Sequence, residues 1–257
     1  MLDCSHYAVL ATVFLHPASE FPRRVRAVED HLKADYPAAA ERLGAFIDLL
    51  PGDGDVLSDE ERDSVQELFT RSFEVQAITT LDVGYVMFGD DYKRAELMVN
   101  LNREHREAGT ECGTELPDHL PNVLQLLAVW KDPALVMEFV QEILHPALVR
   151  MIEEFDDKRI EQRNVLYRKH YKTLIDWDPE RSTMYREALS ALLLVIESDF
   201  TLVEGEPLPE TSQFLSSIGR EMDIEERGEG QRPTMPDPIG PTGCTQPQVQ
   251  LSEWRNP

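Results

Sequence analysis

Residues 183–200 read TMYREALSALLLVIESDF, and this stretch decides the fold class. Its apolar residues follow a helical period, and the run Ala191–Ile196 within it contains no polar residue. A helix without a polar face is stable in water only when other elements cover it on every side. The stretch therefore predicts the most deeply buried helix of an all-helical molecule.

Amphipathic segments precede this helix along the chain, and none shows the clear alternation of a strand. Ser58 and Glu61 form the pattern of a capping box, and the run Pro51–Gly54 marks a turn. Pro146 is expected to kink a long helix because proline removes one backbone hydrogen bond. Short valine-rich pieces such as Val83–Phe88 are ambiguous between helix and strand. We expect helices over residues 20–32, 37–50, 91–108, 133–155 and 183–200, with others around residues 7–14, 65–75 and 123–130. The prediction is an all-α, single-domain helical bundle over residues 1–205.

The composition changes from Glu206 onward. Eight of the 17 prolines lie in the final 52 residues, where glycine is also frequent. Such a segment buries too little apolar area to offset the entropy of ordering it. Residues 206–257 are therefore predicted to be a largely disordered, flexible tail, with one short helix over residues 212–222.

The charge of the chain limits its partners. The formal net charge is -23, from 48 acidic and 25 basic residues. Nucleic acids and anionic lipids bind proteins through lysine and arginine, so both are disfavoured partners. A partner that carries positive charge, such as an arginine-bearing peptide, fits this surface.

The cysteines and apolar runs indicate a reduced, cytoplasmic setting. Cys4, Cys112 and Cys244 lie far apart and are odd in number, which argues against a disulfide framework and a zinc site. No apolar run approaches the roughly 20 residues that span a bilayer. The short run Ala8–Leu15 follows no basic segment, so we expect neither a signal peptide nor a membrane anchor.

Motifs of nucleotide binding and catalysis are missing from the sequence. It contains no GxxxxGK[ST], GxGxxG, GxSxG or HExxH pattern, and no two histidines stand at metal-ligand spacing. We therefore expect no catalytic residue, no metal and no cofactor. One alternative is a helical metal-dependent hydrolase that uses Asp118 and His119, with His105 and Glu96 nearby; metal analysis of pure protein separates it. Another is a helical adaptor with an unrelated partner, which identification of the bound client separates.

The segment Glu115–Pro121, ELPDHLP, carries the most information. Two prolines four residues apart fix the backbone of a rigid entry into the next helix. Asp118 is placed either to cap that helix or to hold His119 by a hydrogen bond. His119 is either a structural histidine or a group that makes binding depend on pH.

This signature and the charged stretch before it resemble the nitrate reductase delta-subunit family of the NarJ/TorD type. The matching features are Arg94, the pair Met98–Val99, Gly109 and the whole of Glu115–Pro121. The segments Phe14–Pro17 and Glu67–Arg71 resemble family features more loosely. The chain differs in lacking a Glu-His pair that many members carry where residues 86–89 stand, and in having alanine at position 95 instead of glycine.

The resemblance implies a single-domain, TorD/NarJ-like helical bundle that acts as a cytoplasmic chaperone and not as an enzyme. Members of the family bind the apo catalytic subunit of a molybdenum-dependent oxidoreductase, typically through an N-terminal or twin-arginine-like peptide. They support molybdenum cofactor insertion and are not part of the finished enzyme. The sequence does not name the client.

A peptide that binds as an amphipathic helix needs an apolar groove with acidic flanks for its arginines. Each aromatic side chain near the signature also suits core packing, so the groove hypothesis depends on the cluster as a whole. The residues expected to bind the client peptide are Tyr85, Phe88, Tyr92, Arg94, Met98, Glu115, Asp118 and His119, with Met87 as further adaptable apolar surface.

Overall fold

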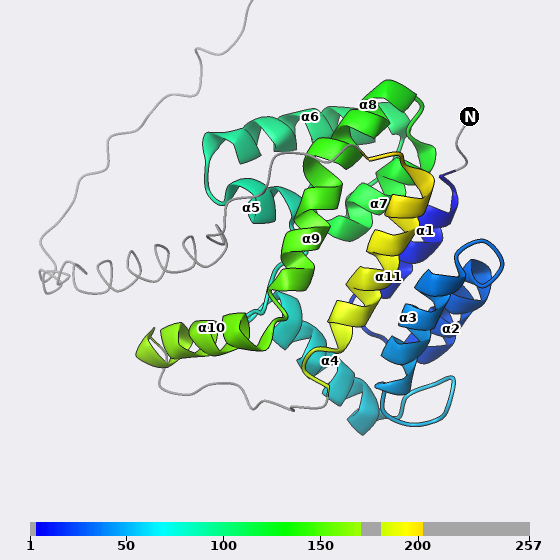
Figure 1. Ribbon diagram of the computed structural model, residues 1–257, viewed down its shortest axis with the longest axis vertical. Coiled ribbons are helices and arrows are strands. Elements are labelled where there is room, and N and C mark those ends of the chain that lie inside the picture. The colour runs from blue at the N-terminus through cyan, green and yellow to red at the C-terminus, as the bar shows by residue number, and fades with distance from the viewer. Residues whose placement is uncertain (1–3, 171–180, 203–257) are drawn as a thin grey trace, which may run out of the picture.

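The computed structural model describes residues 4–170 and 181–202 of the chain (Figure 1). Within these residues the protein is helical and has no strand, which confirms the all-α prediction. The predicted tail at 206–257, its helix at 212–222 and Cys244 lie outside the described residues. The elements are α1 (His6–Ala11), η1 (Thr12–Phe14), α2 (Phe21–Leu32), α3 (Pro37–Asp48), α4 (Asp59–Phe73), α5 (Val83–Phe88), α6 (Tyr92–Ala108), α7 (Leu120–Val129), α8 (Pro133–Phe139), η2 (Val140–Leu144), α9 (His145–Glu153), α10 (Asp157–His170) and α11 (Met184–Asp199).

Helix α11 lies in the middle of the bundle, between α3 and α9 (Figure 1). Ala191, Leu192, Val195 and Ile196 are completely buried, as the apolar run predicted, whereas Leu193 and Leu194 in the middle of the run are only partly buried. Tyr185, near the start of the helix, is surrounded by the aromatic rings of Phe46, Phe69 and Phe73. Burial of rings and branched side chains at this density supplies the main favourable term in folding.

The other helices pack around this centre in pairs. Helix α2 lies against α3, α1 against α7, and α5 against both α6 and α9. In Figure 1, α5 and α6 form one end of the molecule, with α2 and α3 on the opposite side of α11. Among the described residues, no helix has the length and apolar character that crossing a membrane requires.

Several helix ends follow the sequence signals. The Ser58 hydroxyl accepts a hydrogen bond from the Glu61 N–H, and the Glu61 carboxylate accepts one from the Ser58 N–H, so the capping box is confirmed. Asp91 caps α6 by accepting from the Lys93 N–H at 3.0 Å. Gly109 ends α6 with a left-handed φ of 72°, a conformation that glycine adopts at little cost.

The long helix expected over residues 133–155 is interrupted where Pro146 predicted a kink. Proline has no N–H for the carbonyl four residues before it, and the chain forms a π-helical turn, η2, just ahead of it. The His145 N–H reaches back five residues to the Val140 carbonyl. The ambiguous piece Val83–Phe88 is helix α5, and residues 157–170, which no strong pattern marked, form α10.

Candidate functional site

The site is built where the segment before α5 meets the entry into α7. The two pieces of extended chain form a single antiparallel bridge between Asp82 and His119. The Val83 N–H donates to the Asp118 carbonyl at 2.9 Å, and the Leu120 N–H donates to the Leu81 carbonyl at 2.8 Å. This bridge fixes two acidic residues, Asp82 and Asp118, beside each other although 36 positions separate them in the sequence.

Arg94, in the first turns of α6, joins both carboxylates. Its Nε donates to Oδ2 of Asp118 at 3.0 Å, and its Nη2 donates to Oδ2 of Asp82 at 3.1 Å. His119 Nδ1 lies 3.1 Å from Oδ1 of Asp82. A carboxylate can only accept, so Nδ1 carries the proton and Nε2 is the ring nitrogen that Asp82 does not engage. We call Arg94, Asp82, Asp118 and His119 the Arg94 cluster.

The two carboxylates of the Arg94 cluster have opposite pKa shifts. Burial raises the pKa of Asp118 above its ordinary range, and the charge of Arg94 only partly opposes this. Burial also acts to raise the pKa of Asp82, but the hydrogen bond from His119 and the charges of His119 and Arg94 outweigh it, so that pKa is lowered. The Arg94 pKa is raised: burial alone would lower it, but the bonds to Asp118 and Asp82 prevail.

Close packing holds the Arg94 cluster in place. A Cβ atom on Gly84 would stand 2.7 Å from Oδ2 of Asp118, so only glycine leaves room for this carboxylate. On another side, the Arg94 guanidinium lies over the ring of Tyr85, 5.1 Å from its centroid. Such stacking adds a cation–π attraction to the ion pairs.

The role expected for Asp118 has to be corrected. His119 is the N-cap residue of α7, and no side chain caps this helix end. Asp118 is completely buried and is held by Arg94, whereas His119 is held by Asp82. The short-range partners suggested by the sequence therefore give way to partners from α6 and from the segment before α5.

Side chains of α6 and α7 hold the loop from residue 110 to residue 117 in place by hydrogen bonds to it. The Asn122 amide donates to the carbonyls of Cys112 and Leu116 at 3.2 and 2.9 Å. His105, buried on α6, bonds Thr110 through Nδ1 at 2.7 Å and the Pro117 carbonyl through Nε2 at 3.3 Å. Burial lowers the pKa of His105, which favours its neutral form.

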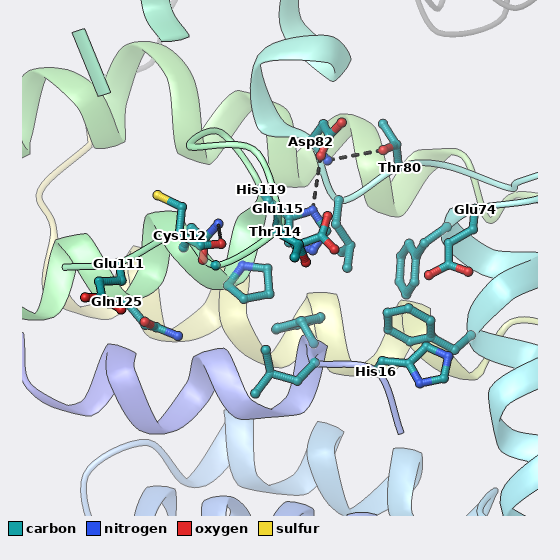
Figure 2. A pocket seen from close by; sticks show the side chains of 18 residues that line it. His16, Glu74, Thr80, Asp82, Glu111, Cys112, Thr114, Glu115, His119 and Gln125 are labelled. Atoms are coloured by element: carbon teal, nitrogen blue, oxygen red, sulfur yellow. Dashed lines mark hydrogen bonds and ion pairs between the residues drawn. The ribbon is translucent and has the colours of Figure 1, made fainter. Parts of the chain in front are cut away.

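A cavity of about 510 Å³ opens between this loop, α4 and the segment after η1 (Figure 2). In Figure 2, Glu74 and His16 lie on one side of it, and Glu111, Cys112 and Gln125 lie on the other. The rings that line it come from Phe14, Phe69 and Phe73, and the His16 ring stands edge-on to Phe69. The cavity is therefore aromatic at one part and polar at another.

The polar part of the cavity is acidic. Glu74, Glu111 and Glu115 line it together with Asp82 and His119. Asp82 is paired with Arg94, but the three glutamates form no ion pair within the part of the chain that the structure describes. Unpaired carboxylates next to aromatic rings attract a ligand that carries both positive charge and apolar groups.

The residues predicted to bind a peptide are only partly brought together. Glu115 and His119 line the cavity. Asp118 and Arg94 do not line it, but their ion pair fixes the segment that contains Glu115 and His119. Tyr85 supports Arg94 from below. The remaining three residues also lie outside the lining of this cavity. Phe88 and Met98 are half-buried on α5 and α6, and Tyr92 is exposed. Their part in peptide binding stays a prediction.

Sequence reasoning missed Asp82, which connects His119 to Arg94. An aspartate before a short, ambiguous helix gives no signal by itself, and its partners lie 12 and 37 positions away. Glu74 was also missed, as one acidic residue among many. The aromatic lining was within reach, because Phe14 and Phe69 lie in the two segments that resemble the delta-subunit family loosely.

Three of the four side chains of the hydrolase alternative already have hydrogen-bond partners, and the fourth, Glu96, is exposed on α6. Asp118 is bound to Arg94, His119 to Asp82, and His105 to Thr110 and the Pro117 carbonyl. In residues 4–170 and 181–202, no group of three or more histidine, cysteine, aspartate or glutamate side chains is placed to hold a metal ion.

Comparisons of the chain with models of protein families, with curated protein sequences and with solved structures find no match. The relationship suggested by the Glu115–Pro121 signature therefore rests on the sequence resemblance itself.

Proposed function

We propose that this protein is a cytoplasmic assembly chaperone of the nitrate reductase delta-subunit type. It binds the N-terminal peptide of the apo catalytic subunit of a molybdenum-dependent oxidoreductase. While bound, it keeps that subunit competent for insertion of the molybdenum cofactor. It carries out no reaction of its own and is not retained in the finished enzyme.

The observation that carries the proposal is the convergence of the resembling segments on one cavity. Phe14, Leu15 and His16 come from the first segment, and Phe69 comes from the second. The signature contributes Glu115, His119 and Pro121. The charged helix α6 contributes Arg94, which fixes the signature by donating to the Asp118 carboxylate. These segments lie up to more than a hundred positions apart in the sequence. If they form one binding site, that explains why each of them resembles the same family.

The chemistry of the cavity suits the end of such a client. A peptide with apolar side chains flanked by arginine can place the apolar groups against Phe14, Phe69 and Phe73. Its guanidinium groups then meet Glu74 and Glu115, and charge-assisted hydrogen bonds favour planar, bidentate contact with carboxylates. The net charge of -23 attracts such a peptide at longer range.

The Arg94 cluster gives the cavity a preformed wall. Asp118 and Arg94 fix the backbone of the signature, so Glu115 and His119 need not be ordered when the ligand arrives. A site that is already ordered loses less conformational entropy on binding. This is the behaviour expected of a chaperone that recognises one particular client.

The test is a binding experiment with the client's own N-terminal peptide. A labelled N-terminal peptide of a molybdoenzyme catalytic subunit from the same organism is titrated with the full-length protein by fluorescence anisotropy. We expect Glu115→Gln to weaken binding about threefold to fivefold, the size of one exposed charge pair. Replacing the arginines of the peptide by glutamine should remove most of this difference.

Glu96→Gln is the matched control, because Glu96 is an exposed acid on α6 that does not line the cavity. It removes one negative charge, as Glu115→Gln does, and should leave the affinity unchanged. Co-purification from cells grown under inducing conditions tests the client itself. Recovery of no molybdoenzyme subunit, together with no measurable peptide binding, would refute the proposed function.

A further inference from the structure

Helix α10 is attached to the rest of the molecule differently from the other helices. Up to residue 169, its buried side chains are Ile160, Arg163, Asn164 and Tyr167, so only two of them are apolar or aromatic. The eight buried residues of α11 are all apolar or aromatic. In Figure 1, α10 runs outward from the foot of α9 beyond the main bundle.

The contacts that dock α10 are mostly polar. Arg163 pairs with the buried carboxylate of Glu154, and Arg159 bonds Glu153 and Glu154 at 2.9 Å each. On the other side, Arg71 of α4 donates to the Asn164 side chain at 2.8 Å. Burial lowers the pKa of both Arg71 and Arg163, which records the cost of removing these charges from water.

Polar docking of this kind sets α10 apart energetically. The attraction in a buried ion pair is largely offset by the desolvation of both charges, so it adds little net stability. The apolar area that remains to hold α10 in place is small, and segments held in this way open locally below the free energy of global unfolding. Helix α10 is therefore an arm whose attachment favours local undocking ahead of global unfolding.

One aromatic side chain connects this arm to the candidate site. The Tyr167 hydroxyl of α10 donates to the Ala77 carbonyl at 3.0 Å. Tyr85 packs against the cluster formed by Ala77 and Tyr167, and Leu166 completes this contact. The ring of Tyr85 also carries the Arg94 guanidinium, 5.1 Å from the ring centroid. The ring of Tyr85 thus packs against the cluster through which α10 is attached and also lies under the guanidinium of Arg94.

We propose that Tyr85 couples the docking of α10 to the Arg94 cluster. When Asp82 and Asp118 hold Arg94 over the ring, Tyr85 stays in the position against which Tyr167 packs. When Arg94 shifts, the ring of Tyr85 loses the guanidinium that lies over it, and the undocked state of α10 gains population. Since Asp82 and His119 line the cavity, an occupant that draws them away also acts on α10, and by linkage docking of α10 acts on the cavity. The coupling is a property of the free protein and does not depend on the identity of any partner.

Hydrogen exchange followed by mass spectrometry tests this coupling in the full-length chain. Arg94→Lys keeps the positive charge beside the two carboxylates but loses the planar group over Tyr85. We expect it to speed exchange of the α10 amides about fivefold, the lower end of typical coupling between sites. Asn164→Ala, which removes the bond from Arg71, should also speed exchange there and shows that the assay detects undocking.

Two further variants make the outcome decisive. In a Tyr85→Leu background, Arg94→Lys should add nothing to the exchange of α10, because the connecting ring is gone. Arg42→Lys changes an exposed arginine of α3 paired with Glu187, far from α10 in the sequence, and should leave the wild-type rates. The proposal is overturned if Arg94→Lys leaves α10 unchanged while Asn164→Ala does not. It is equally overturned if exchange in α2 and α3 rises as much as in α10, or if the effect persists without Tyr85.

Discussion

Burying the Asp118 carboxylate requires both a compensating positive charge and close packing around it. A carboxylate with no exposed surface would normally lose its proton only with difficulty, and its pKa is indeed raised by burial. The Arg94 guanidinium limits that shift by pairing with it at 3.0 Å. The pair tolerates no additional atom on the side of Gly84, where the backbone of α5 approaches the carboxylate.

Gly84→Ala is therefore expected to destabilise the protein. The new Cβ would lie 2.7 Å from Oδ2 of Asp118 and 3.0 Å from Cδ2 of Leu97, and Oδ2 of the buried Asp118 cannot retreat without disturbing its bond from Arg94. Such overpacking costs typically about 1–3 kcal/mol, which exceeds the gain of about 1 kcal/mol from alanine's higher helix propensity. Thermal unfolding monitored by circular dichroism measures the change.

Gly44→Ala supplies the matched control on another helix. At that position the added Cβ meets only Oε1 of Glu29, at an ordinary 3.7 Å. Here the propensity gain is unopposed, so the melting temperature should stay the same or rise slightly. A Gly84→Ala protein as stable as the Gly44→Ala protein would show that the carboxylate is not closely confined.

Among the helices, features that depend on local sequence patterns were predicted correctly, whereas contacts between residues far apart in the sequence were not predicted. The capping box at Ser58, the interruption at Pro146 and the burial of most of the run 191–196 were each predicted from residues near one another in the chain. Helix α10 carries no strong apolar stripe, because half of its buried positions are polar, and for that reason it escaped prediction. The pairs of the Arg94 cluster are fixed by how α5, α6 and α7 pack, which no local pattern specifies.

Asp199 ties three elements together at the end of α11. Its carboxylate accepts from the Tyr7 hydroxyl at 2.7 Å and from the Tyr36 hydroxyl at 2.6 Å, and it lies 2.8 Å from Nε2 of His6. A negative charge at a helix C-terminus is unfavourable by itself. Burial also acts to raise the pKa of Asp199, but the hydrogen bonds from His6, Tyr36 and Tyr7 outweigh it and lower the pKa.

This shift gives the contribution of Asp199 a defined pH dependence. Because the folded pKa lies below the unfolded value of 3.8, the stabilisation is complete above that value and is lost as the pH falls through the folded pKa. Asp199→Asn should lower the free energy of unfolding at pH 7 by roughly 1–3 kcal/mol, and the difference from wild type should shrink below about pH 4. Urea unfolding at pH 7, 4 and 3 measures this difference.

Asp30→Asn is the control, because Asp30 is an exposed acid paired only with Lys33, and it should show no such trend. A destabilisation by Asp199→Asn that stays constant with pH would contradict the assignment.

At the scale of the whole molecule, the fold class followed from the sequence but the cavity did not. Periodicity and the lack of alternating segments were sufficient to predict an all-α bundle. The cavity depends on where η1, α4 and the loop before α7 meet, and each of these contributes only a few lining residues. What the sequence did supply was the acidic character of the surface, which is a sum over the chain and needs no knowledge of the packing.

That excess of acid makes a final prediction about the intact protein. With 48 acidic and 25 basic residues, the carboxylates outnumber the basic side chains by 23, and their mutual repulsion disfavours the compact state. Raising sodium chloride from about 10 mM to about 150 mM shortens the screening length from about 30 Å to about 8 Å. The melting temperature at pH 7 should therefore rise by a few degrees over this range, because the repulsion lost exceeds the attraction lost from exposed ion pairs, each worth about 0–1 kcal/mol. Calorimetry at fixed protein concentration measures it, with sucrose of equal osmolality as the uncharged control. A melting temperature that falls with salt would mean that ion pairs such as those of Arg94 and Glu154 dominate over the net charge.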